Sequence, residues 1–133
     1  MSKMFRNYVG INKEELARVM NSSKFKLPLT YTSFLKKYGK ECGLFGTDCD
    51  VLFPRMIGLN DELSEMIQEE SLSIEIPDKA FVFSGYQGFQ YLFFECEVSD
   101  NPPVYRVMDG GEPPEQIYDS LSKYFEADAK VSI

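Results

Sequence analysis

The chain has 133 residues and a mass of 15.3 kDa, which is the size of one ordinary domain rather than two. Apolar residues make up 44% of it and charged residues 26%, proportions that exclude a disordered chain. Three cysteines make no disulfide framework, no apolar run is long enough to span a membrane, and the opening residues lack the apolar stretch of a signal peptide. The composition therefore predicts a single reduced, cytoplasmic domain over residues 1–133 with no membrane association.

The sequence contains no histidine and carries a net charge of −7. Without histidine, the chain cannot form Ser-His-Asp or Cys-His nucleophilic systems, His-ligated zinc sites or two-histidine iron sites. The negative charge also argues against nucleic acid as a partner, because phosphate binding depends on clustered lysine and arginine. An acidic chain of this kind favours cationic partners.

The negative charge is concentrated in the second half of the chain. Residues 1–59 contain ten basic and five acidic residues, whereas residues 60–78 contain seven acidic residues and no basic one. Residues 79–133 add four basic and nine acidic residues. A mildly basic N-terminal part is therefore followed by an acidic C-terminal part, and no linker-like composition separates the two.

Two helices are predicted before residue 40. Asn12 can cap the first, because Glu15 takes the third helical position of a capping box, and the apolar stripe that follows is Leu16, Val19 and Met20. The second helix has four apolar residues at i, i+3, i+4 and i+7 and ends at a glycine. These five residues are Tyr31, Phe34, Leu35, Tyr38 and Gly39.

The middle of the chain is predicted as loop, short strand and a third helix. The best strand candidate is residues 51–53, immediately before Pro54. The helix is predicted to start with Asn60 as its cap. Its inward-facing residues are expected to be Leu63, Met66 and Ile67.

Beyond Pro77 the periodicity changes to that of a β-sheet. Residues 81–83 and 89–94 read as aromatic-rich strands, joined by a turn at residues 84–88 in a predicted hairpin. Both alternating sets of the second strand are largely apolar, which indicates a central strand covered on both faces, or on one face with an aromatic surface on the other. A further strand is predicted at residues 104–107.

A closing amphipathic helix is predicted after Pro113 and Pro114. Its buried face would consist of Ile117, Leu121, Tyr124 and Phe125. The whole pattern predicts an α+β domain, in which a largely antiparallel sheet has N-terminal helices and a C-terminal helix packed against it.

Glu62, Glu65 and Glu69 form the first candidate binding surface. On a helical wheel they fall within about 60° of one another. No cation lies three or four residues from any of them, and Glu65 has like-charged neighbours four residues away on both sides. Two interpretations stay open: a solvated face that keeps the chain in solution, or a strip shaped for a cationic partner.

Asp109 and Glu112 flank a pair of glycines and form a second acidic concentration. They can belong to a tight turn, contact a partner, or hold Mg²⁺ or Ca²⁺ in a metal-dependent hydrolase. The spacing matches no calcium loop, and the three cysteines lack the paired spacing of a zinc site. We therefore expect no resident metal or cofactor.

Tyr86 lies at the tip of the predicted hairpin turn, where an exposed tyrosine can anchor a partner. The alternative is an ordinary loop tyrosine. The two glycines beside it, Gly85 and Gly88, read as turn glycines, because the spacing and the following helix of a phosphate-binding loop are both missing.

The segment LPLTYTSFLKKYG, from Leu27 to Gly39, resembles the opening helix of the SUKH superfamily. In that superfamily Leu-Pro, two residues, tyrosine, two residues and Phe-Leu lead into a glycine turn. The later order of IPDKAFVFSGYQGFQYLFFE, PVYRV and an amphipathic helix is also similar, so the resemblance runs from about Leu16 to Phe125. The sequence departs from many members in having no tryptophan in its sheet.

The resemblance implies one SUKH-like domain without catalytic activity, typically a bacterial immunity protein that binds and blocks a cognate toxin. Many toxin domains are nucleases with basic faces, which an acidic inhibitor can engage. Fungal relatives regulate cell-wall assembly, so a housekeeping regulatory scaffold is one alternative. A metal-dependent hydrolase that uses Asp109 and Glu112 is the other. Because the binding surface varies among members, the resemblance transfers no site residue.

Overall fold

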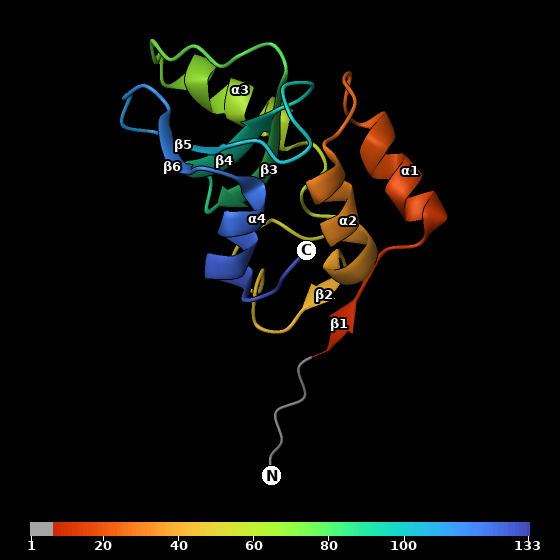
Figure 1. Ribbon diagram of the computed structural model, residues 1–133. Helices are drawn as coiled ribbons and strands as arrows, with labels where there is room; N and C mark the ends of the chain where they lie inside the picture. The colour runs from red at the N-terminus through yellow and green to blue at the C-terminus, as the bar shows by residue number, and fades with distance from the viewer. Residues whose placement is uncertain (1–6) are drawn as a thin grey trace.

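Figure 1 shows a computed structural model that describes residues 7–133. Four antiparallel strands form the main sheet in the order β3-β4-β5-β6, and two short strands, β1 and β2, form a separate ribbon. The strands are β1 (Tyr8–Val9), β2 (Glu41–Cys42), β3 (Ala80–Tyr86), β4 (Gln90–Glu95), β5 (Val104–Met108) and β6 (Glu115–Tyr118). The helices are α1 (Lys13–Asn21), α2 (Leu29–Tyr38), α3 (Leu59–Glu69) and α4 (Leu121–Tyr124), with a π-helical turn η1 (Phe125–Ala129). This is the predicted α+β fold.

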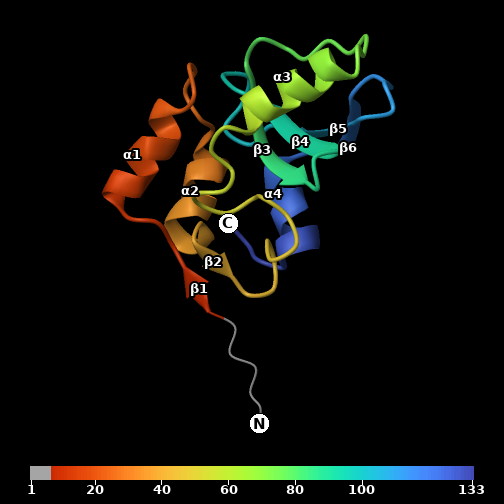
Figure 2. The same ribbon diagram turned by 180° about the vertical axis from the view of Figure 1, so that it is seen from behind.

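Helices cover both faces of the sheet, as the two opposite views show (Figures 1 and 2). Tyr91 of β4 donates from its hydroxyl to Glu62 of α3, whereas the ring of Phe94 lies 5.1 Å from that of Tyr31 in α2. Positions 91 and 94 project to opposite faces of a strand. The prediction of a central strand covered on both sides is therefore confirmed for β4.

The core between α2, α4 and the sheet is largely aromatic. Tyr31 packs its ring against Phe81 and Phe94, and Phe34 stacks on Phe125 at 3.9 Å with the planes 5° apart. The Tyr31 hydroxyl is fully buried and has no hydrogen-bond partner among residues 7–133. Its burial raises the pKa of Tyr31 far above the ordinary value.

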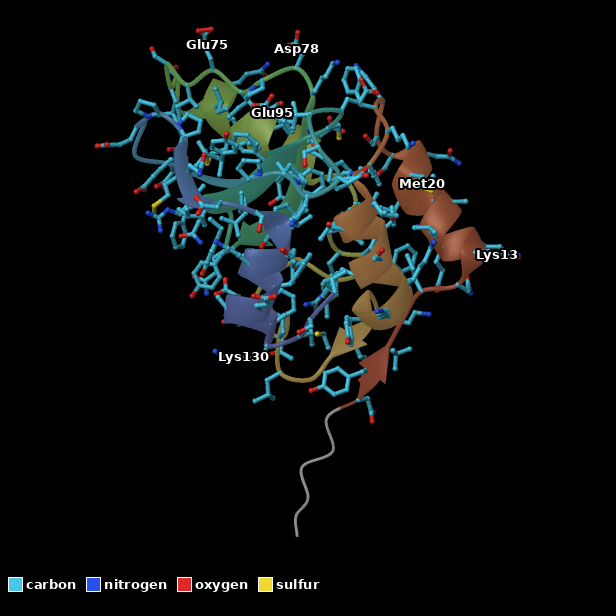
Figure 3. The ribbon with its side chains drawn as sticks, viewed as in Figure 1. Lys13, Met20, Glu75, Asp78, Glu95 and Lys130 are labelled. Carbon is cyan, nitrogen blue, oxygen red and sulfur yellow. The ribbon has the colours of Figure 1, made fainter. Side chains whose placement is uncertain are left out.

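The first two helices follow their predicted signals. Asn12 and Glu15 form both bonds of the capping box at 2.9 and 2.8 Å, and Val19 is buried. Met20 differs from the prediction, because 47% of its surface is exposed on α1, where Figure 3 labels it.

The outer edge of β3 is covered by a side chain of α3 and by a loop. The Asn60 amide donates to the Ala80 carbonyl at 3.0 Å and accepts from the Val82 N–H at 2.8 Å. Further along the strand, Asp50 and Gly85 exchange two backbone hydrogen bonds of 2.8 and 3.0 Å. These four bonds occupy groups that an open sheet edge would present to another strand.

The predicted cap of α3 is wrong. The helix begins at Leu59, after Gly58 in the left-handed conformation with φ of 93°. Asn60 is the second helical residue, and its side chain bonds the backbone of β3 instead of the helix end.

The predicted strand at residues 51–53 is also wrong. Asp50 pairs with Gly85 only as an isolated bridge. The Phe53 N–H then donates to the Gly39 carbonyl at 2.8 Å, and the Met56 N–H donates to the Leu52 carbonyl at 3.2 Å. Because the backbone groups of this segment bond to separate parts of the chain, the segment folds into turns.

The hairpin turn is shorter than predicted. Only Gln87 and Gly88, with φ of 52° and 76°, form its centre, and the Phe89 N–H donates to the Tyr86 carbonyl across it. Residues 84–86 therefore extend β3.

The predicted closing helix combines residues of a strand and a helix. Ile117 belongs to β6, which pairs with β5 and carries the 2.8 Å ion pair between Arg106 and Glu115. The helix starts only at Leu121, where the Ser120 hydroxyl accepts from a backbone N–H of the first turn.

Replacing Asn60 by alanine is expected to lower the free energy of unfolding by about 2 kcal/mol, because the part-buried groups of Ala80 and Val82 lose their partners. Urea unfolding followed by circular dichroism measures the change. Gln68→Ala, at an exposed position of the same helix, is the control and should change stability by less than about 0.5 kcal/mol. Equal losses in the two variants would contradict the role of Asn60.

Tyr31→Phe and Tyr91→Phe are expected to change stability in opposite directions. The first removes a buried hydroxyl without a partner and should raise the free energy of unfolding by about 1 kcal/mol. The second removes the 3.0 Å bond to Glu62 and should lower it by about 1 kcal/mol. Urea unfolding followed by circular dichroism measures both changes. A clear decrease in the free energy of unfolding for Tyr31→Phe would show that the Tyr31 hydroxyl is stabilising.

Candidate functional site

One side of the molecule carries a group of exposed carboxylates, which we call the acidic face. Helix α3 buries Leu59, Leu63 and Met66 and leaves its acidic residues exposed. The segment after it adds more, and Figure 3 shows Glu75 and Asp78 projecting outward at the end of the molecule where α3 lies. The members of the acidic face are Asp61, Glu62, Glu65, Glu69, Glu70, Glu75 and Asp78.

In the described part of the chain, no carboxylate of the acidic face belongs to an ion pair. Among residues 7–133, the ion pairs use Glu15, Glu97, Glu115 and Asp119 as their acidic members, and none lies on the acidic face. The predicted strip of Glu62, Glu65 and Glu69 is therefore present on α3 as an exposed and uncompensated surface.

Glu62 differs from its two neighbours in the strip, because it also fixes a buried side chain. Its carboxylate accepts a hydrogen bond from the Tyr91 hydroxyl, with 3.0 Å between the two oxygens, and Tyr91 is buried in the sheet. Burial first, and then the bond to the Glu62 carboxylate, raise the pKa of Tyr91 far above its ordinary value. Glu62 thus ties the acidic face to β4.

Asp109 and Glu112 lie in the turn between β5 and β6, and both are exposed. The Asp109 N–H donates to the Phe89 carbonyl at 3.0 Å. A Cβ placed on Gly111 would lie 3.6 Å from a methyl group of Leu72, so the turn packs beside the segment that follows α3. The structure therefore brings this turn next to the acidic face.

Within residues 7–133, no group of three or more potential ligands lies close enough to hold a metal ion. Asp109 and Glu112 consequently have no third carboxylate or thiolate with which to form a metal centre. The three cysteines are free, and burial raises the pKa of the Cys42 thiol to about 11.

Tyr86 lies one residue before the hairpin turn rather than at its tip. Its ring is half-buried and makes an edge-to-face contact with Phe89 at 5.4 Å. It lines a cleft of about 600 Å³ that opens between residues 42–49, the β3–β4 hairpin and residues 124–130. Sequence patterns do not indicate this cleft, because it is assembled from three distant segments.

The Cys49 thiol lies half-buried in the cleft, which Asp48 and Asp128 also line. Burial raises the pKa of this thiol, and the neighbouring Asp48, Asp50 and Asp128 raise it further, while the Ser84 hydroxyl acts in the opposite direction. The lining of the cleft includes two carboxylates, Asp48 and Asp128, and one lysine, Lys130.

The sequence matches the SMI1 / KNR4 family (SUKH-1) over residues 10–127, which is almost the whole chain. The chain belongs to this family. The SUKH resemblance of the segment from Leu27 to Gly39, which forms α2 and its flanks, is thereby confirmed.

SUKH-1 domains are generally non-catalytic, and membership is compatible with an immunity role or a regulatory one. A search of curated proteins finds no match to this SUKH-1 chain. Over residues 7–133, none of its helices has both the length and the apolar character needed to cross a membrane.

Glu65→Gln is expected to raise the free energy of unfolding by about 0.5 kcal/mol at low salt, because it removes two like-charge i,i+4 pairs on α3. The gain should vanish at about 1 M NaCl, where such charges are screened. Glu14→Gln is the matched control and should show a small loss, since Glu14 has Arg18 four residues later. Urea unfolding at the two salt concentrations measures the change in stability of both variants. A gain for Glu65→Gln that does not depend on salt would contradict the explanation by like-charge repulsion.

Proposed function

We propose that this SUKH-1 domain is an immunity protein that neutralises a cognate bacterial toxin in the cytoplasm by binding it through the acidic face. The observation that carries the proposal is the set of seven exposed carboxylates from Asp61 to Asp78, none of which is ion-paired among residues 7–133. Like charges held together on α3 reduce its stability, so a function in binding accounts for them better than folding does.

The charge of the acidic face specifies the chemistry of the partner. A toxin with a basic surface, such as a nuclease that binds phosphates, is complementary to it. Opposite charges accelerate association, and contacts that bury the basic surface would block access of the nucleic acid. Such inhibition needs no bond-making by the immunity protein.

The other candidate residues flank this face. The turn with Asp109 and Glu112 packs beside Leu72 and extends the acidic face toward β5 and β6. We assign it to the edge of the contact, where charges act on association rate more than on the final affinity. Tyr86 lies apart from it, in the cleft.

Co-expression with the toxin domain encoded beside this gene tests the proposal. The wild-type chain should restore growth and co-purify with the toxin. Glu62→Gln, Glu65→Gln and Glu69→Gln together should weaken binding about tenfold and flatten its dependence on salt, because three favourable charge contacts are lost. Glutamine at position 62 keeps an acceptor for the Tyr91 hydroxyl.

The matched control carries the same change of net charge at three exposed carboxylates away from both α3 and the cleft lining, namely Glu14→Gln, Glu41→Gln and Asp100→Asn. It should retain affinity within about twofold. Absence of growth rescue and of a complex with the wild-type chain contradicts the proposal and favours a regulatory scaffold. Equal weakening by both triple variants shows that only the net charge matters and that the acidic face is not the contact.

A further inference from the structure

The cleft beside the β3–β4 hairpin combines carboxylates with aromatic walls. Asp48 and Asp128 line it, and neither belongs to an ion pair among residues 7–133. Asp128 accepts one hydrogen bond, from the Tyr118 hydroxyl at 3.2 Å, which leaves its second oxygen for a ligand. The two residues come from different segments of the lining, since Asp48 precedes Cys49 in the chain and Asp128 lies in η1.

The aromatic walls are held in place by edge-to-face contacts with other rings. Phe45 contacts Tyr124 at 6.1 Å, and Tyr86 contacts Phe89 at 5.4 Å. Tyr8 of β1 also lines the cleft and is 55% exposed. Its ring lies 5.7 Å from the ring of Tyr38 in α2. These rings present faces and edges of fixed orientation to a ligand.

We propose that this cleft receives an arginine side chain from an exposed loop of the protein partner. The inference rests on the proposed function, because it assigns a second contact to the same basic partner. A guanidinium group offers five donors in one plane, which can bond two carboxylates from different segments of the lining, and its plane stacks on aromatic rings. In this arrangement it lies between Asp48 and Asp128, and its methylene groups contact Phe45 and Tyr86.

Lys130 is the one basic residue that lines the cleft within residues 7–133. Its ammonium donates to the Ala127 carbonyl at 3.0 Å, and Figure 3 places it at the end of the molecule beyond α4. This contact holds the lysine charge at the rim. Lys130 therefore lowers the affinity for arginine without occupying the position of the guanidinium.

Titration of the ¹⁵N-labelled chain with N-acetyl-arginine amide, followed by amide chemical shifts, tests the inference. Saturable shifts are expected on residues 44–49, 84–90 and 126–130 at ligand concentrations up to about 50 mM. The citrulline analogue, which has the same shape but no charge, should cause no saturable shift. Absence of saturation with arginine amide, equal shifts with citrulline, or shifts confined to α3 would overturn the assignment.

Matched variants locate the binding. Asp48→Asn with Asp128→Asn should raise the dissociation constant of arginine amide at least fivefold, and Lys130→Gln should lower it about twofold. The control Glu14→Gln with Asp100→Asn has the same net charge as the first pair and should leave the constant within about twofold. If the dissociation constant of arginine amide also rises fivefold in the control, the effect is due to net charge alone. That result would contradict specific binding in the cleft.

Failure of the cleft assignment can be distinguished from failure of the proposed immunity function. Growth rescue by the wild-type chain depends on the toxin and not on arginine amide. If rescue occurs while the cleft variants bind the toxin as the wild-type chain does, the cleft assignment is wrong and the immunity function stands. If the cleft binds arginine amide and no rescue occurs, the partner is a basic protein other than a toxin.

Discussion

The hydrogen bonds between the Asn60 side chain and the edge of β3 fix the position of α3, which carries most of the acidic face. Two hydrogen bonds, of 3.0 and 2.8 Å, join the first turn of α3 to the backbone of the sheet, and Leu59, Leu63 and Met66 pack beneath the helix. The bond from Tyr91 to Glu62 adds a third connection. Because α3 is fixed in this way, its glutamates form a surface of defined shape.

Charge and packing are separated in this fold. The aromatic core between α2, α4 and the sheet supplies apolar contacts, while the ion pairs of residues 7–133 lie elsewhere than on the acidic face. Carboxylates on α3 therefore remain available to a partner. The cleft follows the same rule, since its aromatic walls are held by neighbouring rings and its carboxylates have no cationic partner in the described part of the chain.

Features that depend on neighbouring residues could be predicted from the sequence. The capping box at Asn12, the apolar face of α2 and the two-sided burial of β4 are local patterns, and the strip of glutamates on α3 follows from helical spacing. Three other elements depend on distant partners. Asn60 bonds to β3, the predicted strand at residues 51–53 gives its backbone groups to separate segments, and Ile117 pairs within the sheet. For the same reason the cleft could not be predicted, because residues about 40 positions apart line it.

The coverage of the β3 edge limits how a partner can recognise this side of the sheet. A peptide that joined the sheet as an extra strand would first have to displace Asn60 and the bridge between Asp50 and Gly85. Recognition here consequently depends on side chains rather than on main-chain pairing. Exchanging a few exposed residues can therefore change which surface such a domain recognises while its scaffold stays intact.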